Sequence, residues 1–190
     1  MNRREAVGSV ALLLGGSILG AEFFISGCKS NHNPDKVVDL FQPDTVTFLN
    51  EIGETILPAT KTPGAKAADV GGFMGVMVRD CYTPKNQQIF LDGLKKLNVA
   101  ANKKYGSGFM DLKPEDRTAL LNDLDKEQKE YTKTKKKDDP DHYFRMIKEL
   151  TLLGYFTSEI GCTQALRYLP IPGKYDGDYA YKPGDKAWAL

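Results

Sequence analysis

The chain has 190 residues, of which 41% are hydrophobic and 27% charged, and its formal net charge at pH 7 is +1. A length of this order suits one domain with a single hydrophobic core. A nucleic-acid-binding domain would carry a basic face, and 26 Lys and Arg against 25 Asp and Glu give no support for one.

The N-terminal stretch has the organisation of an export signal. A pair of arginines, Arg3 and Arg4, precedes a Gly-rich apolar run over residues 7–25. The glycines dilute the hydrophobicity of this run, which disfavours a permanent transmembrane helix. Residues 25–28 resemble a bacterial lipobox, in which the cysteine, here Cys28, is lipidated and the chain is cut just before it. We therefore predict a twin-arginine, lipoprotein-type signal and an exported, periplasmic chain anchored to a bacterial membrane by lipid; the alternative is an ordinary cleavable signal with a chance cysteine.

Composition divides the chain into four parts. Residues 1–27 are the signal peptide, and residues 28–42 are a polar tether with little to bury. Residues 43–162 have the apolar periodicity of a helical domain. Residues 163–190, which we call the arm, are rich in Pro, Gly and Tyr and form an extended C-terminal segment.

Apolar residues at helical spacing predict the elements of residues 43–162 in order. The predicted helices start at the Asp44 cap and stop at Pro58, span Ala67–Asp80 and Asn86–Lys104, start again at Pro114, and run from the Asp141 cap through Phe156. The last of these is the most apolar, and we expect it to lie centrally, burying Tyr143, Phe144, Ile147, Leu150, Leu153 and Phe156. The predicted fold class is all-α, a compact bundle of about five helices with an extended arm.

Two cysteines remain after Cys28, namely Cys81 and Cys162, in a compartment that permits disulfides. Three alternatives are open. An internal bridge would close a long loop and contribute about 4 kcal/mol in the chain-entropy account. The others are two free thiols, or a bond from one cysteine, for which Cys162 is the candidate, to a partner chain.

The arm combines helix-breaking residues with large aromatic ones. Its prolines and glycines exclude helix over most of its length. Aromatic side chains are effective interface anchors, so we interpret the arm as a segment laid along a partner's surface. The candidate partner-binding residues are Tyr175, Tyr179, Tyr181 and Trp188. The alternative is that the arm wraps the chain's own helices.

No motif predicts catalysis in this chain. The glycines at 71, 72 and 75 lie within a helical pattern rather than between a strand and a helix, as a dinucleotide site requires. Neither histidine has a cysteine or histidine at metal-ligand spacing, and we interpret His142 as a surface or capping residue. We expect no catalytic, cofactor-binding or metal-binding residues.

Several segments, in order and spacing, resemble gluconate 2-dehydrogenase subunit 3, the small (gamma) subunit of membrane-bound gluconate 2-dehydrogenase. They are Ile56-Leu57-Pro58-Ala59-Thr60, Thr62-Pro63-Gly64-Ala65, Phe90-Leu91-Asp92-Gly93-Leu94, Leu97-Asn98, and residues 154–161, 172–177 and 181–188.

The resemblance implies a non-catalytic accessory subunit of a periplasmic FAD-dependent gluconate, sugar or polyol dehydrogenase. It implies a large flavoprotein partner of the glucose-methanol-choline type, which carries the FAD, and a cytochrome c subunit or membrane acceptor beyond it. In such complexes the small subunit often bears the twin-arginine signal under which the folded flavoprotein is exported. Two alternative functions are a free-standing helical lipoprotein that binds a ligand or serves the envelope structurally, and an enzyme using carboxylates whose pairing the sequence does not reveal.

Overall fold

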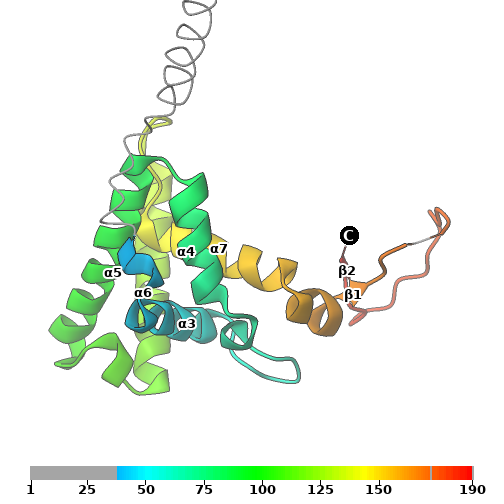
Figure 1. Cartoon of the computed structure of the whole chain (residues 1–190), viewed down its shortest axis with the longest axis horizontal. Helices are drawn as coiled ribbons and strands as arrows, with labels where there is room; N and C mark the ends of the chain where they lie inside the picture. The colour runs from blue at the N-terminus through cyan, green and yellow to red at the C-terminus, as the bar shows by residue number, and fades with distance from the viewer. Residues whose placement is uncertain (1–37, 172, 190) are drawn as a thin grey trace, which may run out of the picture. The chain divides into compact units, whose positions relative to one another are not determined.

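The structure, a computed structural model, describes residues 38–171 and 173–189 (Figure 1). In this part of the chain five α-helices, short 3₁₀ and π turns and one pair of two-residue strands are present. The predicted all-α bundle of about five helices is confirmed. The signal peptide and most of the tether, with Arg3, Arg4 and Cys28, lie outside the described residues.

The elements follow one another with short connections. In chain order they are η1 (Val38–Phe41), α3 (Pro43–Ile56), η2 (Ala65–Ala68), α4 (Val70–Cys81), α5 (Pro84–Tyr105), η3 (Phe109–Asp111), α6 (Pro114–Thr134), α7 (Tyr143–Thr157), η4 (Gly161–Ala165), β1 (Arg167–Tyr168) and β2 (Trp188–Ala189).

Helix α7 is the central element of the bundle, as predicted. It packs against α3, α4, α5 and α6. Its buried residues are Tyr143, Phe144, Met146, Ile147, Leu150, Thr151, Gly154 and Tyr155. Phe90, Leu97 and Phe109 are among the fully buried side chains that complete the core.

The prediction that Leu153 and Phe156 belong to the core is wrong. Both are exposed, together with Leu152. At 100° per residue these three lie on the side of α7 opposite its buried face, and the helices packed on α7 cover only that buried face. We call Leu152, Leu153 and Phe156 the α7 apolar face.

Two predicted N-caps are replaced by neighbouring residues. Helix α3 begins at Pro43, so Asp44 lies inside the first turn, where its charge still favours the positive end of the helix. At α7 the cap is His142 rather than Asp141, and its Nδ1 accepts the Phe144 N–H at 3.3 Å. Burial lowers the pKa of His142, which keeps the imidazole neutral and Nδ1 free to accept.

Helix α4 begins later than its apolar pattern predicts. The stretch Ala65–Ala68 forms a 3₁₀ turn instead, and Asp69 then adopts a left-handed conformation with φ of 48°. Asn50 of α3 holds this break, since its Nδ2 donates to Asp69 Oδ1 at 2.9 Å and its Oδ1 accepts the Gly71 N–H at 2.7 Å. A contact between residues this far apart in sequence overrides the local helical pattern.

None of the described helices combines the length and apolar character needed to cross a membrane.

Candidate functional site

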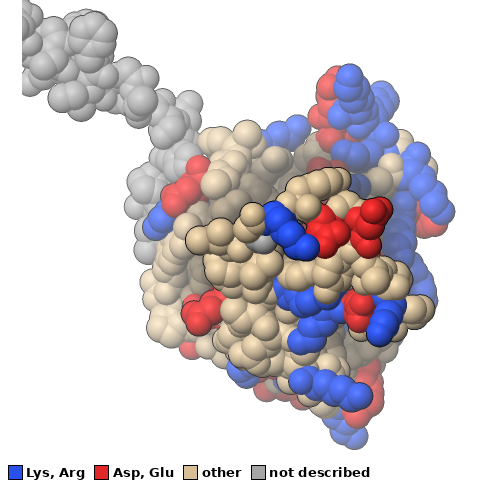
Figure 2. Space-filling model, turned by 90° about the vertical axis from the view of Figure 1, so that its right-hand side faces the viewer, with Lys and Arg blue, Asp and Glu red and all other residues tan. Residues whose placement is uncertain are grey.

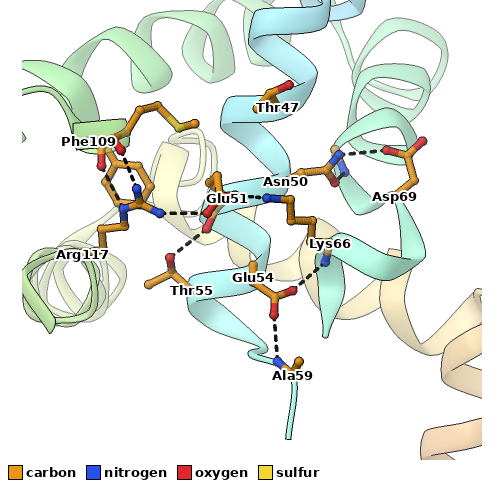
Figure 3. Close-up of polar contacts among 12 residues, drawn as sticks. Thr47, Asn50, Glu51, Glu54, Thr55, Ala59, Lys66, Asp69, Phe109 and Arg117 are labelled. Atoms are coloured by element: carbon orange, nitrogen blue, oxygen red, sulfur yellow. Dashed lines mark hydrogen bonds and ion pairs between the residues drawn. The ribbon is translucent and has the colours of Figure 1, made fainter. Parts of the chain in front are cut away.

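The candidate site centres on Glu51 of α3, a carboxylate that is mostly buried in the bundle (Figure 3). Its Oε1 is paired with Lys66 Nζ, and its Oε2 accepts from Arg117 Nη1 at 2.8 Å. The side chains of Arg117 and Glu51 are only 17% and 18% exposed. The hydrogen bond from Lys66, aided by the charges of Lys66 and Arg117, holds the pKa of Glu51 below its usual value. A carboxylate with both oxygens occupied is a structural brace rather than a general base.

The brace continues into the loop that follows α3. Arg117 also donates through Nε to the Phe109 carbonyl at 3.1 Å, which ties η3 to α6. Glu54 accepts the backbone N–H of Ala59 at 2.8 Å and of Lys66 at 2.9 Å, one on each carboxylate oxygen (Figure 3). Glu51 and Glu54, which look in the sequence like one polar helix face, therefore hold the fold together.

We expect Glu51→Gln to lower the free energy of unfolding by about 1–3 kcal/mol at neutral pH, because the part-buried Arg117 and the exposed Lys66 both lose their charge partner. The folded pKa of Glu51 lies below its unfolded value, so this stabilisation is present above the unfolded pKa and is lost as pH falls through the folded pKa. Urea unfolding at neutral and at acid pH tests this: the difference from wild type should shrink in acid. Glu130→Gln is the control, since its pair with Lys133 is exposed and should contribute less than about 1 kcal/mol. Equal effects of both substitutions would contradict the prediction.

A surface groove of about 530 Å³ lies between α3, α5 and η3. Its apolar lining comes from Phe48, Leu91, Leu94 and Met110, and Lys95 is the charged residue at its wall. No pair of acid and base groups converges there. Across the residues that the structure describes, no three His, Cys, Asp or Glu side chains are grouped so that they could hold a metal ion.

The arm returns on itself rather than extending along the helices. Strand β1 pairs in parallel with β2, with Arg167 opposite Trp188, and the Arg167 N–H donates to the Ala187 carbonyl at 2.8 Å. The prediction that helix is excluded over most of the arm is confirmed for the described residues, since only its first residues join the π turn η4. The described arm is therefore a loop closed at Arg167 and Trp188, and its docking on a partner's surface stays a prediction.

An arginine and two aromatic rings form the closure of this loop. The Arg167 guanidinium carbon lies 4.2 Å from the centroid of the Trp188 ring and 5.3 Å from that of Tyr179. Arg167 Nη1 donates to Tyr179 Oη at 3.1 Å. The two rings meet edge to face with centroids 5.5 Å apart. We call these three residues the arginine clasp.

The four predicted partner-binding residues divide into two sets. Tyr179 and Trp188 belong to the clasp, whereas Tyr175 and Tyr181 are 95% and 73% exposed. Tyr175, Tyr179 and Trp188 share a pocket of about 500 Å³, which Leu169, Ala189, Lys174 and Asp176 also line. Figure 2 shows the side of the molecule on which the arm lies, where broad uncharged areas are interrupted by charged residues of both signs.

Sequence reasoning missed two features of this region. Arg167 carries no motif, and its only signal is that it is the arginine nearest to an aromatic-rich segment. The α7 apolar face was missed because the charged residues on this side of the helix, Arg145 and Glu149, lie only in its first half, and its second half is apolar nearly all round.

The structure keeps Cys81 and Cys162 apart as free thiols. Phe73 in the first half of α4 lies against Gly154 near the end of α7. At the other end of α4, burial and the charges of Glu149 and Asp141 raise the pKa of Tyr82, the residue after the helix. Asp141 comes just before α7, so the end of α4 lies toward the start of α7. The two helices therefore run antiparallel.

This orientation excludes the internal bridge in the described fold. Cys81 lies near the start of α7 and Cys162 beyond its end, and the 15 residues of α7 span roughly 22 Å. A disulfide needs Cα atoms within about 7 Å. Cys162 Sγ instead lies 3.2 Å from the Phe156 carbonyl oxygen, which its thiol can reach as a donor, and a bond from Cys162 to a partner chain stays a prediction.

Comparison with known families gave a match over most of the described chain. A family model described as gluconate 2-dehydrogenase subunit 3 matches residues 43–173, which is more than half of the chain. The searches of curated proteins and of solved structures gave no match. The matched range contains the helical bundle, the α7 apolar face and Arg167, and it ends before Tyr175.

Proposed function

Because the chain belongs to the gluconate 2-dehydrogenase subunit 3 family, we propose that it is the non-catalytic accessory subunit of a dehydrogenase complex. In this proposal the complex is a periplasmic FAD-dependent gluconate, sugar or polyol dehydrogenase, and the chain is its small subunit. Its roles are to escort the folded flavoprotein subunit through export, to stabilise it and to hold it at the membrane. The flavoprotein, of the glucose-methanol-choline type, carries the FAD, and electrons leave it through a cytochrome c subunit or a membrane acceptor.

The observation that carries the proposal is the distribution of exposed apolar side chains. Of the 14 large hydrophobic residues exposed in the described part of the chain, ten lie between residues 152 and 188. These ten are Leu152, Leu153, Phe156, Tyr168, Leu169, Ile171, Tyr175, Tyr179, Tyr181 and Trp188. A concentration of exposed apolar and aromatic groups on one segment is typical of a surface that another protein covers.

Export and anchoring rest on the N-terminal sequence. Arg3 and Arg4 address the pathway that exports folded proteins, which suits a partner that binds FAD before it crosses the membrane. Lipid on Cys28 would then hold the complex at the membrane, with a second contact from the other subunits, because a single acyl chain anchors only weakly.

We also propose that Cys162 forms a covalent link within this complex. It lies between the α7 apolar face and the arm, the two surfaces proposed to contact the flavoprotein. Its bond to a cysteine of the flavoprotein would appear as a band of summed mass on a gel run without reductant, and that band should be absent from Cys162→Ser and retained in Cys81→Ser.

The test of the function is co-purification. The tagged full chain, expressed with the neighbouring dehydrogenase genes, should bring down a protein with a flavin spectrum. The double variant Tyr175→Ala and Tyr181→Ala should recover less of it, whereas Val99→Ala, an exposed apolar residue on α5, should recover as much as wild type. Absence of a flavoprotein from the wild-type preparation would refute the proposal and favour a free-standing lipoprotein.

A further inference from the structure

We infer that Arg167 is a positioning residue whose side chain closes the arm into a loop and thereby presents Ile171, Tyr175 and Tyr181 to the partner subunit. The partner in this inference rests on the proposed function, but the closure of the loop does not. The inference reassigns Tyr179 and Trp188 from partner anchors to internal supports of the loop.

The stacking geometry gives Arg167 its role. A guanidinium is planar and weakly hydrated, so it lies flat on aromatic faces, and tryptophan provides the strongest attraction. The Arg167 guanidinium carbon lies within stacking range of two rings, 4.2 Å from the centroid of Trp188 and 5.3 Å from that of Tyr179. Its hydrogen bond to Tyr179 Oη fixes the orientation of the second ring.

The contacts that the guanidinium makes are with uncharged groups. Arg167 Nε is buried and has no acceptor among the described residues. An arginine held this way is stabilised mainly by the rings around it, so removal of the cation should release both rings together. Lysine, which keeps the charge but not the planar group, should restore the closure only in part.

Few backbone bonds support the closure without the side chain. Each strand of the pair has two residues, and an isolated pair of strands is marginal in water even when much longer. The Lys186 side chain adds a bond to the Gln164 carbonyl. Closing a loop of about 20 residues costs conformational entropy that these bonds alone do not offset.

The large apolar and aromatic residues of the closed arm differ in exposure. Trp188 in the clasp is 42% exposed, against 80% for Ile171, 95% for Tyr175 and 73% for Tyr181. Ile171, Tyr175 and Tyr181 are thus held by a loop that is already folded before the partner binds. Preorganisation of this kind lowers the entropy lost on binding and so raises affinity.

Trp188 provides a direct readout, because it is the only tryptophan of the chain. In the full chain without its partner, Arg167→Ala should increase acrylamide quenching of Trp188 fluorescence and shift its emission to the red. Arg167→Lys should fall between Arg167→Ala and wild type. Arg79→Ala removes another arginine stacked on a ring, that of Phe41 at 4.9 Å, and should leave Trp188 unchanged. Circular dichroism should show the same helical melting for all of these chains.

Partner binding is measured with the same variants by titration of the purified flavoprotein subunit. Arg167→Ala should weaken binding about tenfold, as expected for loss of two cation–π contacts. The double variant Tyr175→Ala and Tyr181→Ala should weaken binding without changing Trp188 quenching.

If Arg167→Ala leaves Trp188 quenching at the wild-type value, the clasp is refuted. If quenching rises while affinity is unchanged, the clasp stands and the arm's docking role is refuted, whereas a wild-type chain that binds no flavoprotein refutes the proposed function alone.

Discussion

Replacement of both Arg3 and Arg4 by lysine is expected to remove the chain and its flavoprotein partner from the periplasm together. The pathway that exports folded proteins reads a pair of arginines, and lysine keeps the charge but not the planar, forked donor group. If the flavoprotein travels only in complex with this chain, it should remain in the cytoplasm with its FAD bound. Immunoblots of periplasmic and cytoplasmic fractions, with dehydrogenase activity in each, measure the outcome.

Cys28→Ala is the matched control for this experiment. It alters the same N-terminal region but leaves the arginine pair intact, so both proteins should still be exported. A larger share of both should then be found in the soluble periplasmic fraction than in wild type, because the lipid is absent and only the second membrane contact remains. If the flavoprotein reaches the periplasm in cells that express the double lysine variant, the escort role is contradicted, since the partner would then have its own export route.

Much of the fold follows from local sequence signals. Proline suits the first turn of a helix, so Pro114 predicts the start of α6, and the structure confirms it. Helix α5 extends two residues before its predicted start because Thr83 caps it and Pro84 occupies its first position. That Thr-Pro signal is present in the sequence, and periodicity alone did not use it.

Contacts between distant residues account for what local signals could not predict. The break before α4 depends on Asn50, 19 residues from the Asp69 that it contacts. The arginine clasp joins Arg167 to Trp188 across an intervening loop that has no periodicity. Composition correctly selected the arm as rich in interface residues, but only the closed loop distinguishes the outward Tyr175 from the internally stacked Trp188.

Gly93→Ala is expected to lower the free energy of unfolding by about 2–4 kcal/mol, because it overpacks the contact between α5 and α7. A Cβ at Gly93 would lie 2.4 Å from both Cβ and Cγ of Tyr143. Tyr143 has little room to move, because its ring packs on His142 with centroids 4.5 Å apart. Burial, with a contribution from Glu127, raises the pKa of the Tyr143 phenol to about 12, which accords with a largely enclosed side chain.

Gly53→Ala makes the same chemical change in α3 and should have the opposite sign. Its Cβ would lie 3.4 Å from Ala65 Cβ, which is ordinary van der Waals contact. The gain in helix propensity should then raise the free energy of unfolding by up to about 1 kcal/mol. Urea unfolding followed by circular dichroism compares the two, and equal midpoints would contradict the close approach of α5 and α7.

The Gly93 contact also bears on function, because α7 connects the bundle to both proposed docking surfaces. If α7 shifts away from α5 to make room for the new methyl group, the α7 apolar face moves with it, while the arginine clasp lies beyond η4 and depends on contacts within the arm. A folded Gly93→Ala chain should therefore keep the wild-type quenching of Trp188 and bind the flavoprotein more weakly. Wild-type affinity in that chain would mean that the arm binds the partner without help from the α7 apolar face.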